Sequence, residues 1–409
     1  MVDILPFKGM LYNPDRVKDI SAVISPPYDL ISADLKKKLK KLSPYNISNL
    51  TLPESSKGKD KYLHAFQLLG EWIENEILVF DKQKCFYLVE EIFTEGNEQK
   101  SIKGFIGLSK IEEYDSGKVL RHENTLPKPK EDRLKLLEAT KTNFGLIYTI
   151  YRDHTGLISD IMAEQEPDIA VRPAYDPGLL FKLWKISRPS KLEQIIVLMK
   201  GKPVLIADGH HRYETSRIYS SKKEGDLRQN YVLTLFVNSN QKHISIYPTF
   251  RLIRFTNSFN KANLLKSVQK YFQIIRLQED ITSLRSMLAR EKHKSFIMYL
   301  GAKQIFLIRL KNEFLKNNIW EDLDINILHD LLIGNIIGSS NIAEISFTHL
   351  ENELKQNIIC GSYDLGILLN APPIEQVESL SRQGRLMPQK STYFYPKPCT
   401  GLVMYKFNS

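Results

Sequence analysis

An acid, a glycine, two histidines and an arginine follow a short apolar run in KPVLIADGHHRYETS, residues 202–216. The run from Pro203 to Ala207 is short and partly β-branched, which predicts a buried strand. Residues 212–219 have helical spacing, and Gly209 permits a sharp turn between the strand and the helix. The first N–H groups of such a helix and its dipole favour an anion, above all phosphate.

The side chains of this turn suit the same chemistry, because Arg can bind phosphate through two N–H donors. We expect four residues to cradle phosphate groups: Gly209, His210, His211 and Arg212. Asp208 stands where a strand delivers a catalytic carboxylate or an oxygen ligand for Mg²⁺. Two alternatives stay open. In the first, Asp208 would be only an N-cap, and the histidines would belong to a solvated turn. In the second, His210 and Glu214, four residues apart on a helix face, would bind zinc.

The elements around this turn predict a mixed α/β protein. Residues 62–77 have the spacing of a core-facing helix, and 33–42 form a short basic amphipathic helix. Segments 85–93 and 102–111 read as a hairpin, 231–237 as a strand, and 295–300 with 303–310 as a second strand pair. A buried helix is expected at 325–337 and a buried strand at 363–370. A further helix is expected to start near Glu131 and Asp132, after an extended TLPKPK segment. We predict three domains: 1–111, 112–250 and 251–409.

Composition and charge limit the class of protein. The chain has 409 residues, 42% of them hydrophobic and 25% charged, with a net charge of +10. This charge favours phosphates, nucleotides or other anions. Nucleic acid is not the expected partner, because basic residues are spread over the chain and no helix-turn-helix pattern is visible. Three scattered cysteines argue against disulfides and a zinc ribbon.

Membrane insertion is not expected either, because no apolar run approaches the ~20 residues that cross a bilayer. The first residues do not read as a signal peptide, so we expect a cytoplasmic protein. The oligomeric state cannot be predicted. No Walker P-loop, GxGxxG, HExxH or GxSxG motif is present. The tail MPQKSTYFYPKPCTGL, residues 387–402, is polar, aromatic and rich in proline, which favours a rigid binding loop. The alternative is a C-terminal strand that docks on a core.

Four segments carry a resemblance to a known family: SPPYDLI, RHENTLPKPKEDRLKLLEATKTN, VLIADGHHRYETS and MPQKSTYFYPK. They resemble the domain-of-unknown-function ten-fifteen family, which is related to the ParB and free serine kinase fold. ADGHHR is similar to the DGHHR box of the archaeal free serine kinase. One departure is YPTFR, where Phe250 stands in place of the histidine of a PTHR-type motif.

The resemblance implies a ParB/SerK-like nucleotide-binding core flanked by additional α/β domains. It also implies transfer of a phosphoryl group from ATP, ADP or pyrophosphate to the hydroxyl of free L-serine, with Mg²⁺ as cofactor. Phosphoryl transfer needs positioned phosphates, neutralised charge and a base near the attacking hydroxyl.

Roles for individual residues follow from this resemblance. Glu123 is the expected base, and Asp208 orients the hydroxyl or holds Mg²⁺. Three residues would supply further positive charge to the donor: Lys128, Lys130 and Arg133. Six residues are expected to bind serine: His122, Asn124, Lys390, Ser391, Thr392 and Tyr393. Alternatives are that the two lysines lie on a solvated surface and that Asn124 and Asp132 are caps.

Three other functions fit the same residues. The chain could be a ParB-like nucleotide-binding protein with a regulatory or DNA-associated role, or a phosphohydrolase that uses water in place of serine. It could also be a non-catalytic protein that binds a metabolite. Phosphate release with and without serine separates the kinase from the hydrolase.

Overall fold

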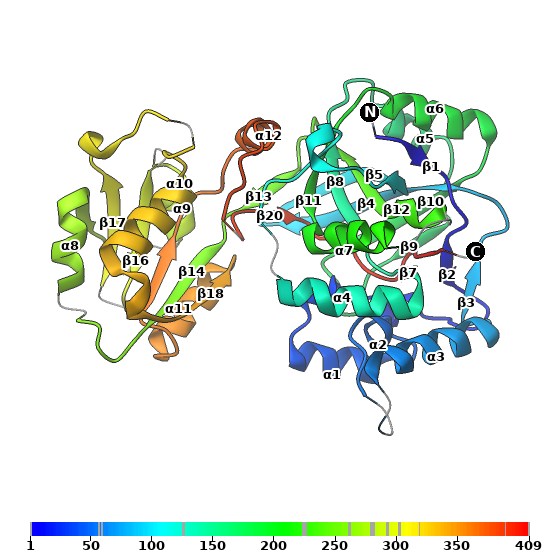
Figure 1. Ribbon diagram of the computed structural model, residues 1–409, viewed down its shortest axis with the longest axis horizontal. Coiled ribbons are helices and arrows are strands. Elements are labelled where there is room, and N and C mark those ends of the chain that lie inside the picture. The colour runs from blue at the N-terminus through cyan, green and yellow to red at the C-terminus, as the bar shows by residue number, and fades with distance from the viewer. Residues whose placement is uncertain are drawn as a thin grey trace. The chain divides into compact units, whose positions relative to one another are not determined.

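The computed structural model describes residues 2–55, 58, 60–124, 127–222, 227–260, 263–278, 283–291, 294–301, 304–318, 320–388 and 390–407. The chain forms two compact units (Figure 1). Unit 1 consists of Met1–Arg121, Thr125–Ile244 and Pro396–Ser409, and unit 2 of His122–Asn124 and Ser245–Tyr395. Both units contain helices and sheets, so the expected mixed α/β class is confirmed.

Unit 1 is built on one large sheet, whose nine described strands come from distant parts of the chain. Their order is β6 (Val119–Leu120), β11 (Val204–Asp208), β8 (Ile147–Tyr151), β12 (Tyr231–Asn238), β5 (Glu98–Lys110), β4 (Phe86–Glu95), β10 (Leu180–Ile186) and β9 (Ile169–Val171), with β1 (Ile4–Leu5) also on β5. Two smaller pairs are β2 (Met10–Tyr12) with β3 (Leu78–Phe80), and β7 (Thr142–Asn143) with β21 (Tyr405–Lys406). Segments 1–111 and 112–250 therefore share one sheet.

Strand pairing fixes the position of β11, the strand that ends at Asp208. The predicted hairpin is present, because β4 and β5 pair antiparallel up to Glu95 opposite Glu98. β12 pairs with β5 on one side and runs parallel to β8 on the other. β11 pairs antiparallel with β8, and the register shifts between Ile206 and Asp208. Such an irregularity redirects the side chain at the end of a strand.

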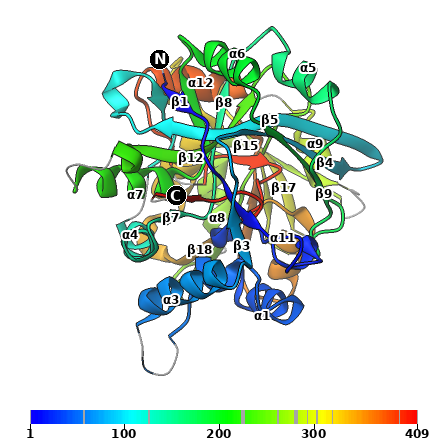
Figure 2. The ribbon, with the colours of Figure 1, turned by 90° about the vertical axis from the view of Figure 1, so that its right-hand side faces the viewer.

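Seven described α-helices belong to unit 1. They are α1 (Ala33–Leu42), α2 (Ser48–Thr51), α3 (Lys61–Glu74), α4 (Pro127–Thr140), α5 (Leu157–Ala163), α6 (Pro189–Met199) and α7 (His210–Ser221). Within this unit, α5 and α6 lie at one end, and α1 and α3 lie at the other (Figures 1 and 2). Helices α4 and α7 pack against each other. Trp72 of α3 and Leu136 of α4 belong to the same apolar core.

Helix α4 begins earlier than the sequence suggested. Its first residue is Pro127, whereas the predicted start was near Glu131. Proline is tolerated in the first turn of a helix, where its missing N–H would have no partner. Thr125 and Leu126, part of the segment expected to be extended, lie outside the described residues.

Unit 2 contains an antiparallel sheet and several helices. The strand order is β15 (Phe272–Arg276), β17 (Ile305–Leu310), β16 (Ser295–Tyr299), β19 (Leu365–Leu368), β14 (Phe250–Phe255) and β18 (Ile342–Thr348). A separate pair joins β13 (Ser245–Tyr247) to β20 (Tyr393–Tyr395). The helices are α8 (Leu264–Tyr271), α9 (Leu284–Leu288), α10 (Asp324–Asn326), α11 (Glu351–Ile359) and α12 (Ile374–Arg382). The helix expected at 325–337 is mostly a π-helix, Ile327–Ile337.

In the described ranges, no helix combines the length and the apolar character needed to cross a membrane.

Candidate active site

The strand–turn–helix predicted around residue 208 is present. β11 ends at Asp208, Gly209 follows, and α7 begins at His210. Gly209 has a left-handed backbone with a φ of 94° and serves as the N-cap of α7. A Cβ atom at this position would lie only 3.1 Å from Nε of Arg212. Both the sharp turn and the close approach of Arg212 therefore require glycine here.

Asp208 does not stand alone at the end of the strand. Its Oδ1 accepts a hydrogen bond from Nζ of Lys397, and its Oδ2 accepts one from Nη2 of Arg212. Burial alone would raise the pKa of Asp208, but the positive charges of Lys397 and Arg212 outweigh it and hold the pKa well below its usual value. The carboxylate is thus ionised and engaged by two cations. This arrangement suits a group that positions Arg212 and Lys397 better than a proton acceptor.

The side chain of Arg212 lies against two glycines. Its Nη1 donates to the carbonyl oxygen of Leu146. A Cβ atom at Gly145 would lie 3.2 Å from Nη1 of Arg212, and one at Gly209 would lie 3.2 Å from its Cζ. Only 14% of the side chain is exposed. The guanidinium is therefore held in one place before any ligand arrives, which lowers the entropic cost of binding.

Replacing Gly209 tests whether the left-handed turn at this position requires glycine. Gly209→Ala should lower the free energy of unfolding by roughly 1–2 kcal/mol, because an alanine in the left-handed region is strained. Gly145→Ala is the matched control, since Gly145 also borders Arg212 but is not among the positive-φ glycines. Denaturant unfolding of the two variants gives the comparison. A Gly209→Ala protein as stable as the unmodified chain would contradict the role of the turn.

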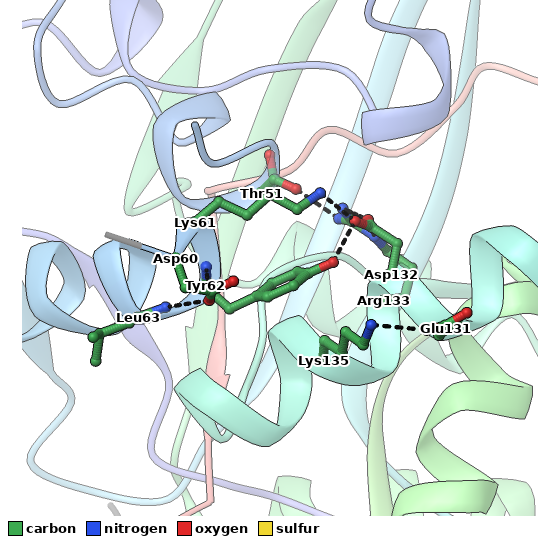
Figure 3. Close-up of polar contacts among 9 residues, drawn as sticks. All are labelled: Thr51, Asp60, Lys61, Tyr62, Leu63, Glu131, Asp132, Arg133 and Lys135. Atoms are coloured by element: carbon green, nitrogen blue, oxygen red, sulfur yellow. Dashed lines mark hydrogen bonds and ion pairs between the residues drawn. The ribbon is translucent and has the colours of Figure 1, made fainter. Parts of the chain in front are cut away.

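A second arginine, Arg133 of α4, is fixed by a polar network that Figure 3 shows. Its Nη1 donates to the carbonyl oxygen of Thr51 at 2.6 Å, and its Nε donates to Oδ2 of Asp132 at 3.0 Å. Oδ1 of Asp132 accepts hydrogen bonds from Nζ of Lys61 at 2.6 Å and from the hydroxyl of Tyr62 at 2.9 Å. Helix α3, which carries Lys61 and Tyr62, is thereby tied to α4.

This network sets the charge of Asp132. Burial alone would raise its pKa, but the hydrogen bonds from Lys61 and Arg133 outweigh it and keep the pKa well below the usual value. Asp132 was expected only to favour the start of a helix or to cap it. Instead it is ionised inside α4 and orients Arg133, whose guanidinium lies 4.3 Å from the ring centroid of Tyr28.

Arg133 and Arg212 border the same small pocket, of about 70 Å³. Its other walls come from seven segments of unit 1: Tyr28, Thr51, Leu136, Leu137, Thr142, Asn143, Phe144, Gly145, Ile147, Thr215, Ser216, Val232 and Thr400. Asp208 with its two cations carries one more positive than negative charge, and so does Asp132 with Lys61 and Arg133. The pocket thus lies between two clusters with excess positive charge, which suits a small anion.

The expected base and serine-binding residues gather in unit 2. Oε2 of Glu123 accepts a hydrogen bond from the backbone N–H of Lys390 at 3.2 Å. Nε2 of His122 lies 2.7 Å from Oγ1 of Thr392, and His122 is buried. The hydroxyl of Ser391 donates to the carbonyl oxygen of Pro388. Two segments more than 260 residues apart are therefore joined, Glu123 and Lys390 being separated by 267 positions.

The other expected site residues lie around these clusters. His210 is buried, His211 is partly exposed, and neither borders the pocket of Arg133 and Arg212. Tyr393 begins β20, and its ring stacks on His349 at 4.2 Å between centroids. Lys130 is partly exposed and Asn124 is exposed, and the side chain of Lys128 in α4 lies outside the described residues.

The carboxylates expected to bind a metal ion are engaged in ion pairs and hydrogen bonds. The zinc alternative does not fit, because Glu214 is paired with Arg121 at 3.5 Å and Arg217 at 3.3 Å. Across the described ranges, no group of three His, Cys, Asp or Glu side chains could hold a metal. Asp208 does not fit a direct Mg²⁺ ligand in this arrangement, because cationic side chains bind both of its oxygens. No chemical step is therefore assigned to a metal held by Asp208.

Sequence reasoning missed several residues of this site. Lys397, the partner of Asp208, was noted in the proline-rich tail but not assigned to the turn, and Thr400 was not singled out. Tyr28 lies in the SPPYDLI segment of the family resemblance, but no role was assigned to it. The available signal was the setting of Lys397 and Tyr28 next to prolines, in YPKPCTG and SPPYD.

The chain belongs to the family described as "Protein of unknown function (DUF1015)", which matches residues 4–326. The family resemblance seen in the sequence is thus confirmed. No curated protein matches the chain significantly.

Among solved structures, the chain is similar to a conserved hypothetical protein from Pyrococcus furiosus, with 13% identity, 73% of this chain and 94% of that chain covered, and a TM-score of 0.38. It is also similar to a free serine kinase in complex with AMP, with 14% identity, 72% and 89% coverage and a TM-score of 0.39. SbnI with a C-terminal truncation from Staphylococcus aureus gives 12% identity, 73% and 86% coverage and a TM-score of 0.39. Similarities at this level do not establish an activity.

Proposed function

We propose that the chain is a phosphotransferase that moves a phosphoryl group from ATP, ADP or pyrophosphate to the hydroxyl of free L-serine, giving O-phosphoserine. One observation carries the proposal. Arg212 of the ADGHHR turn and Arg133 of α4 are both fixed by carboxylates, and both border one pocket between clusters with excess positive charge. The choice of free L-serine as the acceptor rests on the resemblance of that turn to the DGHHR box of the free serine kinase.

In this proposal the two arginines bind phosphate oxygens of the donor. Each guanidinium has five N–H groups, and within the described residues Arg212 uses one each for Asp208 and Leu146. The remaining donors can neutralise the charge that develops as the bond from phosphorus to the leaving oxygen breaks. Asp208 and Asp132 act through Arg212 and Arg133 as positioning residues.

Glu123 is the proposed base, as the resemblance implies. The serine hydroxyl would give its proton to the carboxylate of Glu123 while its oxygen forms the new bond to phosphorus. The neighbouring residues of unit 2 would bind serine: His122, Asn124, Lys390, Ser391, Thr392 and Tyr393. A dependence on Mg²⁺ stays a prediction, and Mg²⁺ carried by the donor phosphates would satisfy it.

Removing Arg212 should weaken donor binding. A charge-assisted hydrogen bond contributes roughly 1.5–3 kcal/mol, so Arg212→Ala should lower the affinity for the donor by about ten- to a hundred-fold. Arg217→Ala is the matched control, because Arg217 lies on the same helix but pairs with Glu113 and Glu214 and does not border the pocket. Calorimetric titration with ATP, ADP and pyrophosphate measures the effect. Unchanged affinity in a folded Arg212→Ala protein would refute the phosphate role.

The acceptor is tested by phosphate release with and without L-serine. A kinase consumes the donor in a serine-dependent reaction and keeps the transferred phosphate on serine. Serine-independent release of inorganic phosphate would instead assign the pocket to a phosphohydrolase. Donor binding without turnover under either condition would refute the catalytic proposal.

A further inference from the structure

Unit 1 contains a second and much larger cleft that shares no lining residue with the arginine pocket. Its volume is about 600 Å³. This is within the range of roughly 300–1,000 Å³ that is typical of small-molecule sites. Apolar and aromatic side chains form much of its surface: Leu5, Pro6, Phe7, Leu108, Tyr231 and Tyr405. Leu5 is 41% exposed, so an apolar ligand would cover surface that is now open to water.

Strand pairing preforms this cleft. Leu5 of β1 pairs with Leu108 of β5. Phe7 forms an antiparallel bridge with Cys85, with backbone hydrogen bonds of 3.0 and 2.9 Å. The rings of Phe7 and Tyr405 meet edge to face at 5.6 Å between centroids. A ligand would therefore meet a surface whose backbone is already ordered.

Four cations also line the cleft: Lys8, Lys84, Lys110 and Arg228. No carboxylate is among its described lining residues. Two of these cations have local partners, since Nζ of Lys110 lies 3.6 Å from Asp3 and Nη1 of Arg228 donates to the carbonyl oxygen of Phe407 at 3.2 Å.

Lys8 and Lys84 are the two cations of the lining that most favour an anionic ligand. They directly flank the isolated antiparallel bridge between Phe7 and Cys85, which brings the two segments that carry these exposed lysines side by side. Neither has an ion-pair partner within the described ranges. Two exposed lysines on a lining without a described carboxylate attract an anionic group, so the chemistry of the rim favours a negatively charged head.

We propose that this cleft binds a small amphipathic anion, with its apolar body on the Leu5 and Phe7 side and its phosphate or carboxylate group beside Lys8 and Lys84. The apolar part provides most of the binding free energy, and the lysines provide selectivity for charge. This site is separate from the proposed phosphotransfer pocket and does not depend on it.

The test uses four ten-carbon probes below their micelle concentrations: decyl phosphate, decanoate, decanol and decyltrimethylammonium. Calorimetry on the full chain should find saturable 1:1 binding of one or both anions, and weaker or no binding of the other two. The ratio of the two anion affinities tells whether phosphate or carboxylate is preferred. Equal binding of decanol, or no binding of either anion, would overturn the proposal.

Variants locate the bound probe. Lys8→Ala/Lys84→Ala should weaken anion binding about five- to tenfold, the effect expected for two exposed charges. Lys37→Ala/Lys41→Ala on the exposed face of α1 is the matched control and should leave binding unchanged. Leu5→Gln should weaken every probe that binds. Anion binding that the Lys8/Lys84 and Leu5 changes both leave intact would show adventitious binding elsewhere and overturn the assignment.

Discussion

Glu123→Gln is expected to lower kcat for serine phosphorylation by about 10²–10⁴-fold, the usual contribution of a general base. Glutamine keeps the volume and an oxygen that can accept the N–H of Lys390, a hydrogen bond of 3.2 Å in the unchanged chain. It loses the basicity that takes the proton of the serine hydroxyl. Donor affinity should therefore stay nearly the same. Steady-state kinetics and a donor titration on the same preparation measure the two quantities.

Two further variants make this result interpretable. Glu131→Gln is the matched control, because Glu131 is exposed on α4 and forms an ion pair with Lys135, four residues further along the same helix (Figure 3). It should keep full kcat. Asp208→Asn should weaken donor binding, because Arg212 and Lys397 lose the carboxylate that positions them. Full kcat in Glu123→Gln together with complete loss in Asp208→Asn, at saturating donor, would make Asp208 the base and reverse the assignment.

Glu91→Gln is expected to stabilise the protein strongly at alkaline pH. Glu91 of β4 is only 6% exposed, and burial raises its pKa to about 8. The folded state therefore keeps a proton that the unfolded state loses near pH 4.5. The stability of the unmodified chain should fall as the pH rises from about 4.5 to about 8, by roughly 3–5 kcal/mol. The glutamine of the variant carries no charge at any of these pH values, so the variant should not lose stability in this way.

Denaturant unfolding between pH 5 and pH 8 measures the difference between Glu91→Gln and the unmodified chain. The advantage of the variant should grow with pH over this range. Glu90→Gln is the matched control, because Glu90 lies on the opposite face of the same strand, near Lys103 and Lys182 at 4.0 and 3.8 Å. It should not show this gain. A pH-independent difference for Glu91→Gln would show that Glu91 ionises freely in the folded protein.

Local patterns were sufficient for the elements that carry the site. The apolar run before Asp208 and the spacing after it predicted β11 and α7, and the strand patterns at 85–93 and 102–111 predicted the β4–β5 hairpin. These features depend on neighbouring residues, whose side chains alternate or recur within a few positions. The left-handed turn at Gly209 follows from the absence of a Cβ atom.

Long-range pairings could not be read in the same way. Lys397 meets Asp208 across 189 positions, and no local pattern links a lysine in a proline-rich tail to a distant strand end. Pairing of β12 with β5 places segments 1–111 and 112–250 in one sheet, although the sequence predicted a domain boundary after residue 111. The sequence EE in β4 does not tell which of Glu90 and Glu91 faces the core, because a shift of one residue exchanges the faces.

The most direct test of the proposed activity is mass-spectrometric detection of O-phosphoserine after incubation of the purified chain with free L-serine, Mg²⁺ and ATP, ADP or pyrophosphate in turn. The proposal predicts phosphoserine with at least one donor, in an amount that rises with time and protein concentration and falls sharply in Arg212→Ala. Absence of phosphoserine with every donor, from a protein that is folded by circular dichroism, would contradict it.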